Sequence, residues 1–173
     1  MIRTSHVCVP KVLGLLVAAL YCAYAVLTPD EGHIIDAINL VFHEAGHTLM
    51  PFFGQLVQAA AGSLFQVLVP LVCAISFLKK GDKYSVGLML VWMGQSLSGV
   101  ARYAGDAIEM KLELLGGEAS IHDWRFILET LDALTWTYYI SYALYGTALL
   151  ISIYGIALAL KDSITVCETV DVV

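Results

Sequence analysis

Two histidines and a glutamate lie close together in an apolar part of the chain, as His43-Glu44-Ala45-Gly46-His47. On a helix, residues four positions apart project from the same face, so both imidazoles can bind one metal ion. This HExxH spacing is typical of zinc sites in which the glutamate takes a proton from a water molecule on the metal. We therefore predict a Zn²⁺ site with His43 and His47 as ligands and Glu44 as the general base.

The apolar surroundings of this motif strengthen the prediction. Ionisable groups inside a membrane-type segment are costly unless they pair or bind a metal. Asp36 and Asn39 precede the histidines at helical spacing and extend a polar stripe along the same face. Either side chain could orient an imidazole through a hydrogen bond. The alternative is that these polar groups only satisfy one another between helices.

A catalytic zinc site needs a third protein ligand and keeps its fourth position for water. His122 is one candidate for that ligand, because Gly116 and Gly117 permit a turn before it. Ser120 and Asp123 then fit a capping box that opens a helix over residues 121–134, which would hold His122 in place. His6 and His33 are poorer candidates, since the first falls in a terminal tail and the second lies about three turns before His43.

Asp106 is the competing third ligand. It shares one helical face with Gln95, Ser98 and Arg102, although Arg102 and Asp106 are four residues apart and could simply pair with each other. Asp123 is a further possibility, more naturally a helix cap or a partner that orients a ligand. The sequence leaves the choice between His122 and Asp106 open.

The elements that must position these residues are apolar and helical. Hydrophobic residues make up 59% of the 173 residues and charged residues only 14%, and the mean hydropathy is +0.78. The apolar residues fall in runs close to the ~20 residues that cross a bilayer core, with no strand-like alternation. We predict an all-α polytopic membrane bundle formed by one domain, residues 1–173. Its apolar segments are 10–27, 35–54, 56–78, 84–105 and 135–160.

Lysine and arginine positions suggest a topology. Basic residues flank the first segment, the turn near residues 79–83 and the end of the last segment. All of them face the cytoplasm if segment 35–54 is embedded or re-entrant rather than fully crossing, with Pro51 and Gly54 allowing the turn. This arrangement gives four crossings, cytoplasmic termini with a tail at 161–173, and an outer connection at 106–134. Residues 1–25 also fit a cleavable signal peptide, but we expect a retained span.

Charge and cysteine content exclude other classes of protein. The formal charge is −6 and no basic stripe is present, so nucleic acid is not an expected partner. The four cysteines form no CxxC pair, and neither a disulfide framework nor a thiolate zinc site follows from them.

The HEAGH motif on a membrane-embedded helix resembles the intramembrane zinc metallopeptidases of the site-2 protease type. In that family the two histidines bind zinc, the glutamate is the general base, and a later transmembrane aspartate completes the coordination. By order along the chain, the resemblance implies that role for Asp106. The sequence departs from the family here, because Gly105-Asp106-Ala107 lacks the family's Asn-Pro-Asp-Gly or Leu-Asp-Gly context, and there is no PDZ-like insertion.

A broader pattern covers residues from about 35 to 134. The HEAGH motif, Gly116-Gly117 and His122-Asp123-Trp124 together are similar to a functionally unassigned group of small bacterial membrane proteins. This resemblance implies a zinc site in a bacterial inner membrane and names no substrate.

These patterns predict a membrane-embedded zinc metallohydrolase, in first place a peptidase acting on a peptide or membrane-protein substrate. Two alternatives stay open. One is a metal-binding membrane protein without hydrolysis, such as a sensor, transporter or assembly factor. The other is a zinc hydrolase that acts on a lipid amide or ester. Glu44 separates catalysis from simple metal binding, since storage or transport needs no base beside the two histidines.

Overall fold

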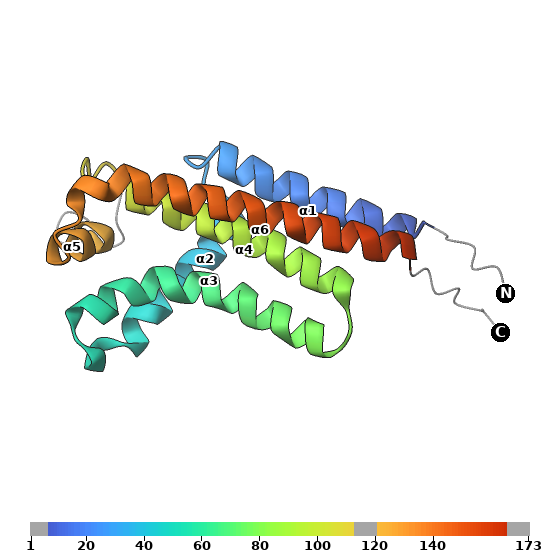
Figure 1. Cartoon of the computed structure of the whole chain (residues 1–173), viewed down its shortest axis with the longest axis horizontal. Helices are drawn as coiled ribbons and strands as arrows, with labels where there is room; N and C mark the ends of the chain where they lie inside the picture. Colours follow the sequence, from blue (N-terminus) through green and yellow to red (C-terminus); the bar gives the residue numbers. More distant parts are fainter. Residues whose placement is uncertain (1–6, 113–120, 166–173) are drawn as a thin grey trace.

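A computed structural model describes residues 7–112 and 121–165, and all regular structure in these ranges is helical (Figure 1). Several residues named in the sequence analysis lie outside the described residues, namely His6, Gly116, Gly117, Ser120 and the last eight residues of the predicted tail. The elements are α1 (Val9–Leu27), α2 (Ile34–Leu49), the 3₁₀ turn η1 (Pro51–Phe53), α3 (Gln55–Lys79), α4 (Lys83–Gly105), α5 (Asp123–Thr130), the 3₁₀ turn η3 (Leu134–Trp136) and α6 (Thr137–Thr165). The all-α prediction is confirmed for this part of the chain.

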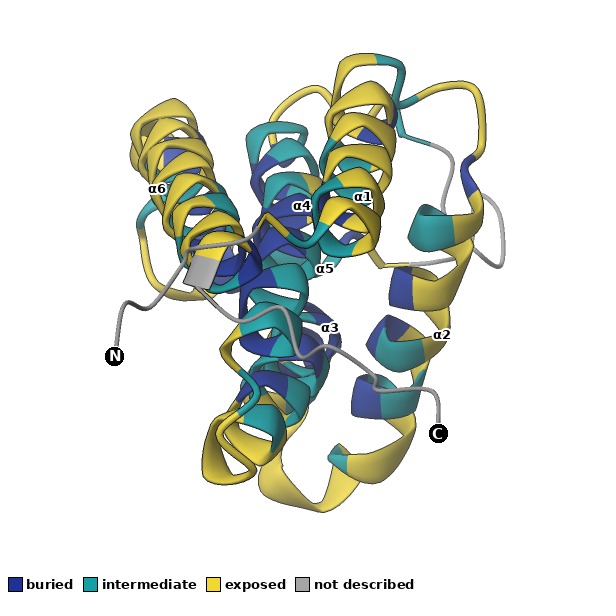
Figure 2. Cartoon of the chain, turned by 90° about the vertical axis from the view of Figure 1, so that its right-hand side faces the viewer, coloured by how far each residue is buried: buried dark blue, intermediate teal, exposed yellow. Residues whose placement is uncertain are grey.

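α4 is the central helix of the bundle. It packs against α1, α3 and α6, and Figure 2 shows buried residues concentrated on α4 and exposed residues on the outward faces of α1 and α6. Two glycines allow α4 to approach α6 closely. A methyl group at Gly94 would lie 2.7 Å from the Ala148 carbonyl oxygen, and one at Gly87 would lie 2.5 Å from the Gly155 carbonyl oxygen. Small residues therefore set the distance between α4 and α6.

Three helical segments are long and apolar enough to cross a membrane, namely Val9–Leu27, Gln55–Lys79 and Leu134–Ile164. These segments identify a membrane protein. α4 has a sufficient 23 residues but is less apolar, because its buried face carries Gln95 and Ser96 toward neighbouring helices rather than toward lipid. The predicted fourth crossing stays a prediction.

The predicted turn at Pro51 and Gly54 is confirmed. α2 ends at Leu49, η1 begins at Pro51, and Gly54 has a φ of 90°, which favours glycine. With 16 residues, α2 is about 24 Å long, shorter than the ~30 Å core of a bilayer. Its length suits the predicted embedded or re-entrant position, and it packs mainly on α3.

The beginning of α1 and the end of α6 meet at one end of the bundle, opposite α5 (Figure 1). The Cys8 N–H donates to the Ser163 carbonyl at 2.8 Å, and Lys11 pairs with Asp162 at 3.0 Å. The Tyr84 hydroxyl, at the start of α4, donates to the Lys11 carbonyl at 2.8 Å. Lys11 and Lys161 lie toward this end, as does the α3–α4 turn with its lysines (Figure 1), while the side of the membrane that this end faces stays a prediction.

The predicted outer connection contains a shorter helix than the sequence predicts. α5 has eight residues instead of the predicted 121–134, and it ends at Thr130 because Asp132 adopts a φ of 52°, in the left-handed region. His122 is its N-cap and accepts a hydrogen bond from the Arg125 N–H at 3.2 Å. This cap takes the place of the predicted capping box and fixes Asp123 in the first helical turn.

The close approach of α4 and α6 gives a stability test. Gly94→Ala should lower the free energy of unfolding by roughly 1–3 kcal/mol, because the methyl group would overlap Ser152 and the Ala148 carbonyl. The thermal midpoint measured in detergent should fall accordingly. The matched control is Gly146→Ala in α6, where an added methyl meets nothing within 4 Å and should not destabilise. Equal thermal midpoints for the two variants would show that the helices are not packed this closely.

Candidate metal centre

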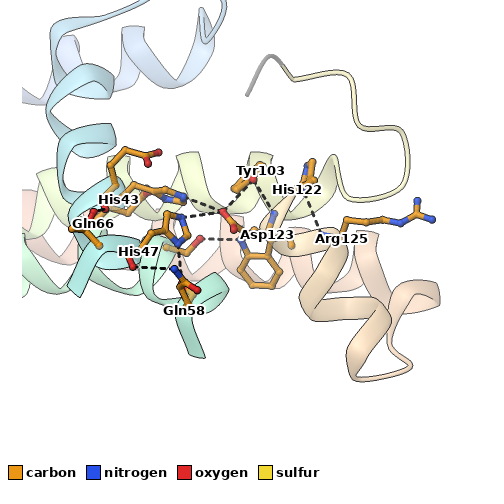
Figure 3. Close-up of polar contacts among 12 residues, drawn as sticks. His43, His47, Gln58, Gln66, Tyr103, His122, Asp123 and Arg125 are labelled. Atoms are coloured by element: carbon orange, nitrogen blue, oxygen red, sulfur yellow. Dashed lines mark hydrogen bonds and ion pairs between the residues drawn. The ribbon is translucent and has the colours of Figure 1, made fainter. Parts of the chain in front are cut away.

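The two histidines of the HExxH motif lie one turn apart on α2 and turn their Nε2 atoms toward α5 (Figure 3). The Asp123 Oδ2 atom lies 3.3 Å from the Nε2 of His43 and 3.2 Å from the Nε2 of His47. One ligand atom from each of these three residues falls within 4.8 Å of the others, so the group could hold a metal ion. We call His43, His47 and Asp123 the metal cluster.

The Nδ1 atom of each imidazole, which faces away from Asp123, lies within hydrogen-bond distance of an oxygen acceptor. His47 Nδ1 lies 2.8 Å from the Gln58 carbonyl oxygen, which can only accept, so Nδ1 carries the proton. His43 Nδ1 lies 2.9 Å from the Gln66 Oε1. The Gln66 amide is oriented in turn, because its Nε2 donates to the Ser96 carbonyl at 3.1 Å. In the neutral imidazoles both Nε2 atoms are therefore left as lone-pair donors for a metal.

Asp123 enters from the opposite side, where the N-cap at His122 fixes the start of α5. The Tyr103 hydroxyl of α4 accepts from the Asp123 backbone N–H at 3.0 Å and donates to Oδ2 at 3.2 Å. Burial raises the pKa of Asp123, but its contacts with His43 and His47 outweigh burial and lower the pKa to about 2. The carboxyl group is consequently ionised at neutral pH.

These contacts place two lone-pair nitrogens against a carboxylate oxygen. Such atoms stay this close only if a positive charge lies among them, either an added proton on an imidazole or a metal ion. Ligand atoms about 2.0–2.1 Å from a tetrahedral Zn²⁺ are separated by roughly 3.3 Å. The observed 3.2 and 3.3 Å separations have that value. The donor set and these two separations fit a metal ion held by nitrogen and oxygen ligands, and tetrahedral zinc is one such ion.

Gly62 of α3 leaves open the space between the imidazoles. A methyl group there would lie 2.5 Å from the Nε2 atoms of both His43 and His47. The methyl would thus fall close to the position that a metal ion shared by the two nitrogens would take. Next to this space, the Trp124 Nε1 donates to the Ser63 Oγ at 3.0 Å and ties α5 to α3.

A cavity of about 920 Å³ opens beside the cluster. His43, Glu44, His47 and Asp123 all line it. Glu44 is exposed, and no hydrogen bond or ion pair connects its carboxylate to any other residue in 7–112 or 121–165. An unpaired carboxylate thus lines the same cavity as the three residues of the metal cluster.

The third position is where the structure differs from the sequence prediction. His122 turns away from the α2 histidines, and its Nε2 lies 3.3 Å from Asp106 Oδ2 (Figure 3). Asp106 also accepts from the backbone N–H groups of Lys111 and Leu112, at 2.9 and 3.0 Å. The structure brings neither His122 nor Asp106 to the metal cluster, and Asp123 takes the place predicted for them. The reason is the cap: His122 is needed to begin the helix that Asp123 opens.

The residues predicted to orient the imidazoles have other partners. Asn39 donates to Gln95 at 2.8 Å, and Gln95 donates to Asp36 at 2.7 Å, so this part of the polar stripe joins α2 to α4. Arg102 does not pair with Asp106 but with Asp30, at 2.5 Å. His33 lies at the start of α2, 2.9 Å from the Thr28 hydroxyl and away from the cluster.

Sequence reasoning missed the residues that orient the ligands. The Gln66 side chain and the Gln58 backbone carbonyl hold the two Nδ1 atoms. A glutamine within an apolar segment, Gln66, was the available signal, whereas the Gln58 contact uses a backbone carbonyl that any residue offers. No sequence pattern indicated the role of Tyr103, because that role depends on where α5 packs. The chain matches no protein-family model, no curated protein and no solved structure, so membership of a family stays a prediction from the motif.

Metal content after ligand substitution tests the cluster. Asp123→Ala, like His43→Ala and His47→Ala, should lower zinc affinity by more than the ~10–100-fold typical of losing an orienting residue. Asp106→Asn and His122→Asn should keep zinc, since asparagine is a good N-cap residue and neither side chain reaches the cluster. Plasma emission spectrometry of the purified variants provides the measurement. Loss of zinc from Asp106→Asn with retention in Asp123→Ala would reverse the assignment.

Gly62 provides a second test that removes no ligand. Gly62→Ala should abolish zinc binding while the protein stays helical, because the methyl group takes the space between the Nε2 atoms. Gly99→Ala is the matched control, since its methyl would meet only the Gln66 Nε2, at an ordinary 3.8 Å. Full zinc occupancy in Gly62→Ala would contradict the cluster geometry.

Proposed function

We propose that this protein is a membrane-embedded zinc metallohydrolase, in first place a peptidase, with Glu44 as its general base. The observation that carries the proposal is the exposed, unpaired Glu44 carboxylate in the same cavity as the three ligand atoms. A site that only stores or senses a metal needs no such group. A histidine–aspartate network that only supports the fold needs neither the carboxylate nor the cavity.

The chain's residues divide the chemistry among them. His43, His47 and Asp123 would hold zinc, which when bound lowers the pKa of a coordinated water and polarises a carbonyl group. Glu44 accepts the proton of the attacking water and returns it to the leaving amine, so that one water and one amide give one acid and one amine. Tyr103 holds Asp123 in place through both its hydroxyl contacts.

The position of the cluster suggests where the reaction takes place. It lies toward the end of the bundle that carries α5, away from the lysine-bearing end (Figure 1). With the basic end cytoplasmic, as the distribution of lysines favours, the cluster faces the outer interface of a bacterial inner membrane. The polar residues of the cavity wall, including Gln58 and Gln95, would then give water a path to the zinc.

Replacing the base tests the proposal. Glu44→Gln should lower turnover by ~10²–10⁴-fold, because the amide cannot accept a proton, while zinc stays bound. Membranes from cells that express the parent or the variant are compared by mass spectrometry of new peptide termini and of lipids. Glu109→Gln, which removes a carboxylate in an exposed pair with Lys111, is the matched control and should keep full activity.

The outcomes separate the possible functions. New peptide termini that disappear in Glu44→Gln support the peptidase. Lipid products with the same dependence would transfer the assignment to a lipid amide or ester hydrolase. Equal products in the parent and Glu44→Gln, with zinc bound in both, would leave a non-catalytic metal-binding protein.

A further inference from the structure

Arg102 places a positive charge in the wall of the cavity beside the metal cluster. Its side chain is 33% exposed. Outside the cluster and Glu44, the other charged residue that the structure describes in this wall is Asp36, which already accepts a hydrogen bond from Gln95. Arg102 is therefore the one arginine or lysine in the described lining of the cavity.

The partner of Arg102 is exchangeable. The nearest acidic residue on its own helix, Asp106, is engaged by His122 and by two backbone N–H groups. Arg102 instead reaches the α1–α2 loop, where it donates to Asp30 and, at 3.2 Å, to the Pro29 carbonyl oxygen. The Asp30 side chain is 86% exposed, so water and other anions compete for Arg102 and the pair contributes little stability.

We propose that Arg102 binds an anionic group of the substrate, a phosphate or a carboxylate, which takes the place of Asp30. The planar guanidinium matches both anions with two parallel hydrogen bonds. Apolar residues of the same cavity, among them Val26 and Leu40, suit an alkyl chain. The substrate class is thus an amphiphile with an anionic end. The inference rests on the proposed function for its chemistry, but binding of the anion does not require zinc.

Equilibrium dialysis tests the inference on the full chain in phosphatidylcholine nanodiscs, with and without zinc and with empty discs subtracted. The probes are octyl phosphate, octanoate and neutral octanol at pH 7.5. The parent should bind at least one anionic probe roughly tenfold more tightly than octanol, as expected for hydrogen bonds between charged groups. Arg102→Gln should lose this preference and Arg102→Lys should keep part of it. Tighter binding of octyl phosphate assigns a phospholipid-type group, and tighter binding of octanoate assigns a peptide carboxyl terminus.

Asp30→Asn provides a second test in case Arg102→Gln does not fold. It frees Arg102 without touching the cavity charge, so anionic probes should bind more tightly than to the parent. Equal anion binding by the parent and Arg102→Gln, or no gain in Asp30→Asn, would overturn the inference. If instead the proposed function fails, because no zinc binds or because Glu44→Gln is as active as the parent, the anion preference would persist. Failure of the inference alone would leave zinc binding and Glu44-dependent turnover intact.

Discussion

The Nε2 atoms of two imidazoles face one carboxylate oxygen at 3.3 and 3.2 Å, and the hydrogen bonds to the two Nδ1 atoms determine what can lie between the three facing atoms. The Gln58 carbonyl and the oriented Gln66 amide keep the protons of His47 and His43 on the outer nitrogens. When both imidazoles are neutral, the facing atoms all carry lone pairs, and their mutual repulsion is relieved by an added proton or by a metal ion. The rest of the bundle serves to hold this arrangement, since the ligands and the residues that orient them come from α2, α3, α4 and α5.

The helices around the cluster have different tasks. α2 supplies both histidines and Glu44 but packs mainly on α3, where Gly46 lies so close to the Ala61 carbonyl that an added methyl would be 2.3 Å away. α4 contributes Tyr103, which holds Asp123, and Arg102, which lines the same cavity as the cluster. α4 also carries the buried Gln95 and Ser96 in the centre of the bundle. Its neighbours cover those residues, so they need not face lipid.

The sequence predicted the helical class, the apolar segments and the turn at Pro51–Gly54, because hydropathy and backbone restriction are local properties. It also predicted the pairing of His43 and His47, which follows from helix geometry alone. Identifying the third ligand required knowledge of where α5 packs on the bundle. His122 and Asp123 are neighbours in sequence but face different partners, and no local pattern distinguishes the cap from the cluster residue. Gln58, Gln66 and Tyr103 depend on the same long-range packing.

The span between the ligands has a thermodynamic consequence. His43 and Asp123 are 80 positions apart, so a cation held by both closes a long loop, as a disulfide would. Binding only the folded chain, the ion would add stability that rises with the logarithm of its free concentration. Metal starvation would then act as the removal of a cross-link, and α5 would be the part whose attachment to the bundle weakens.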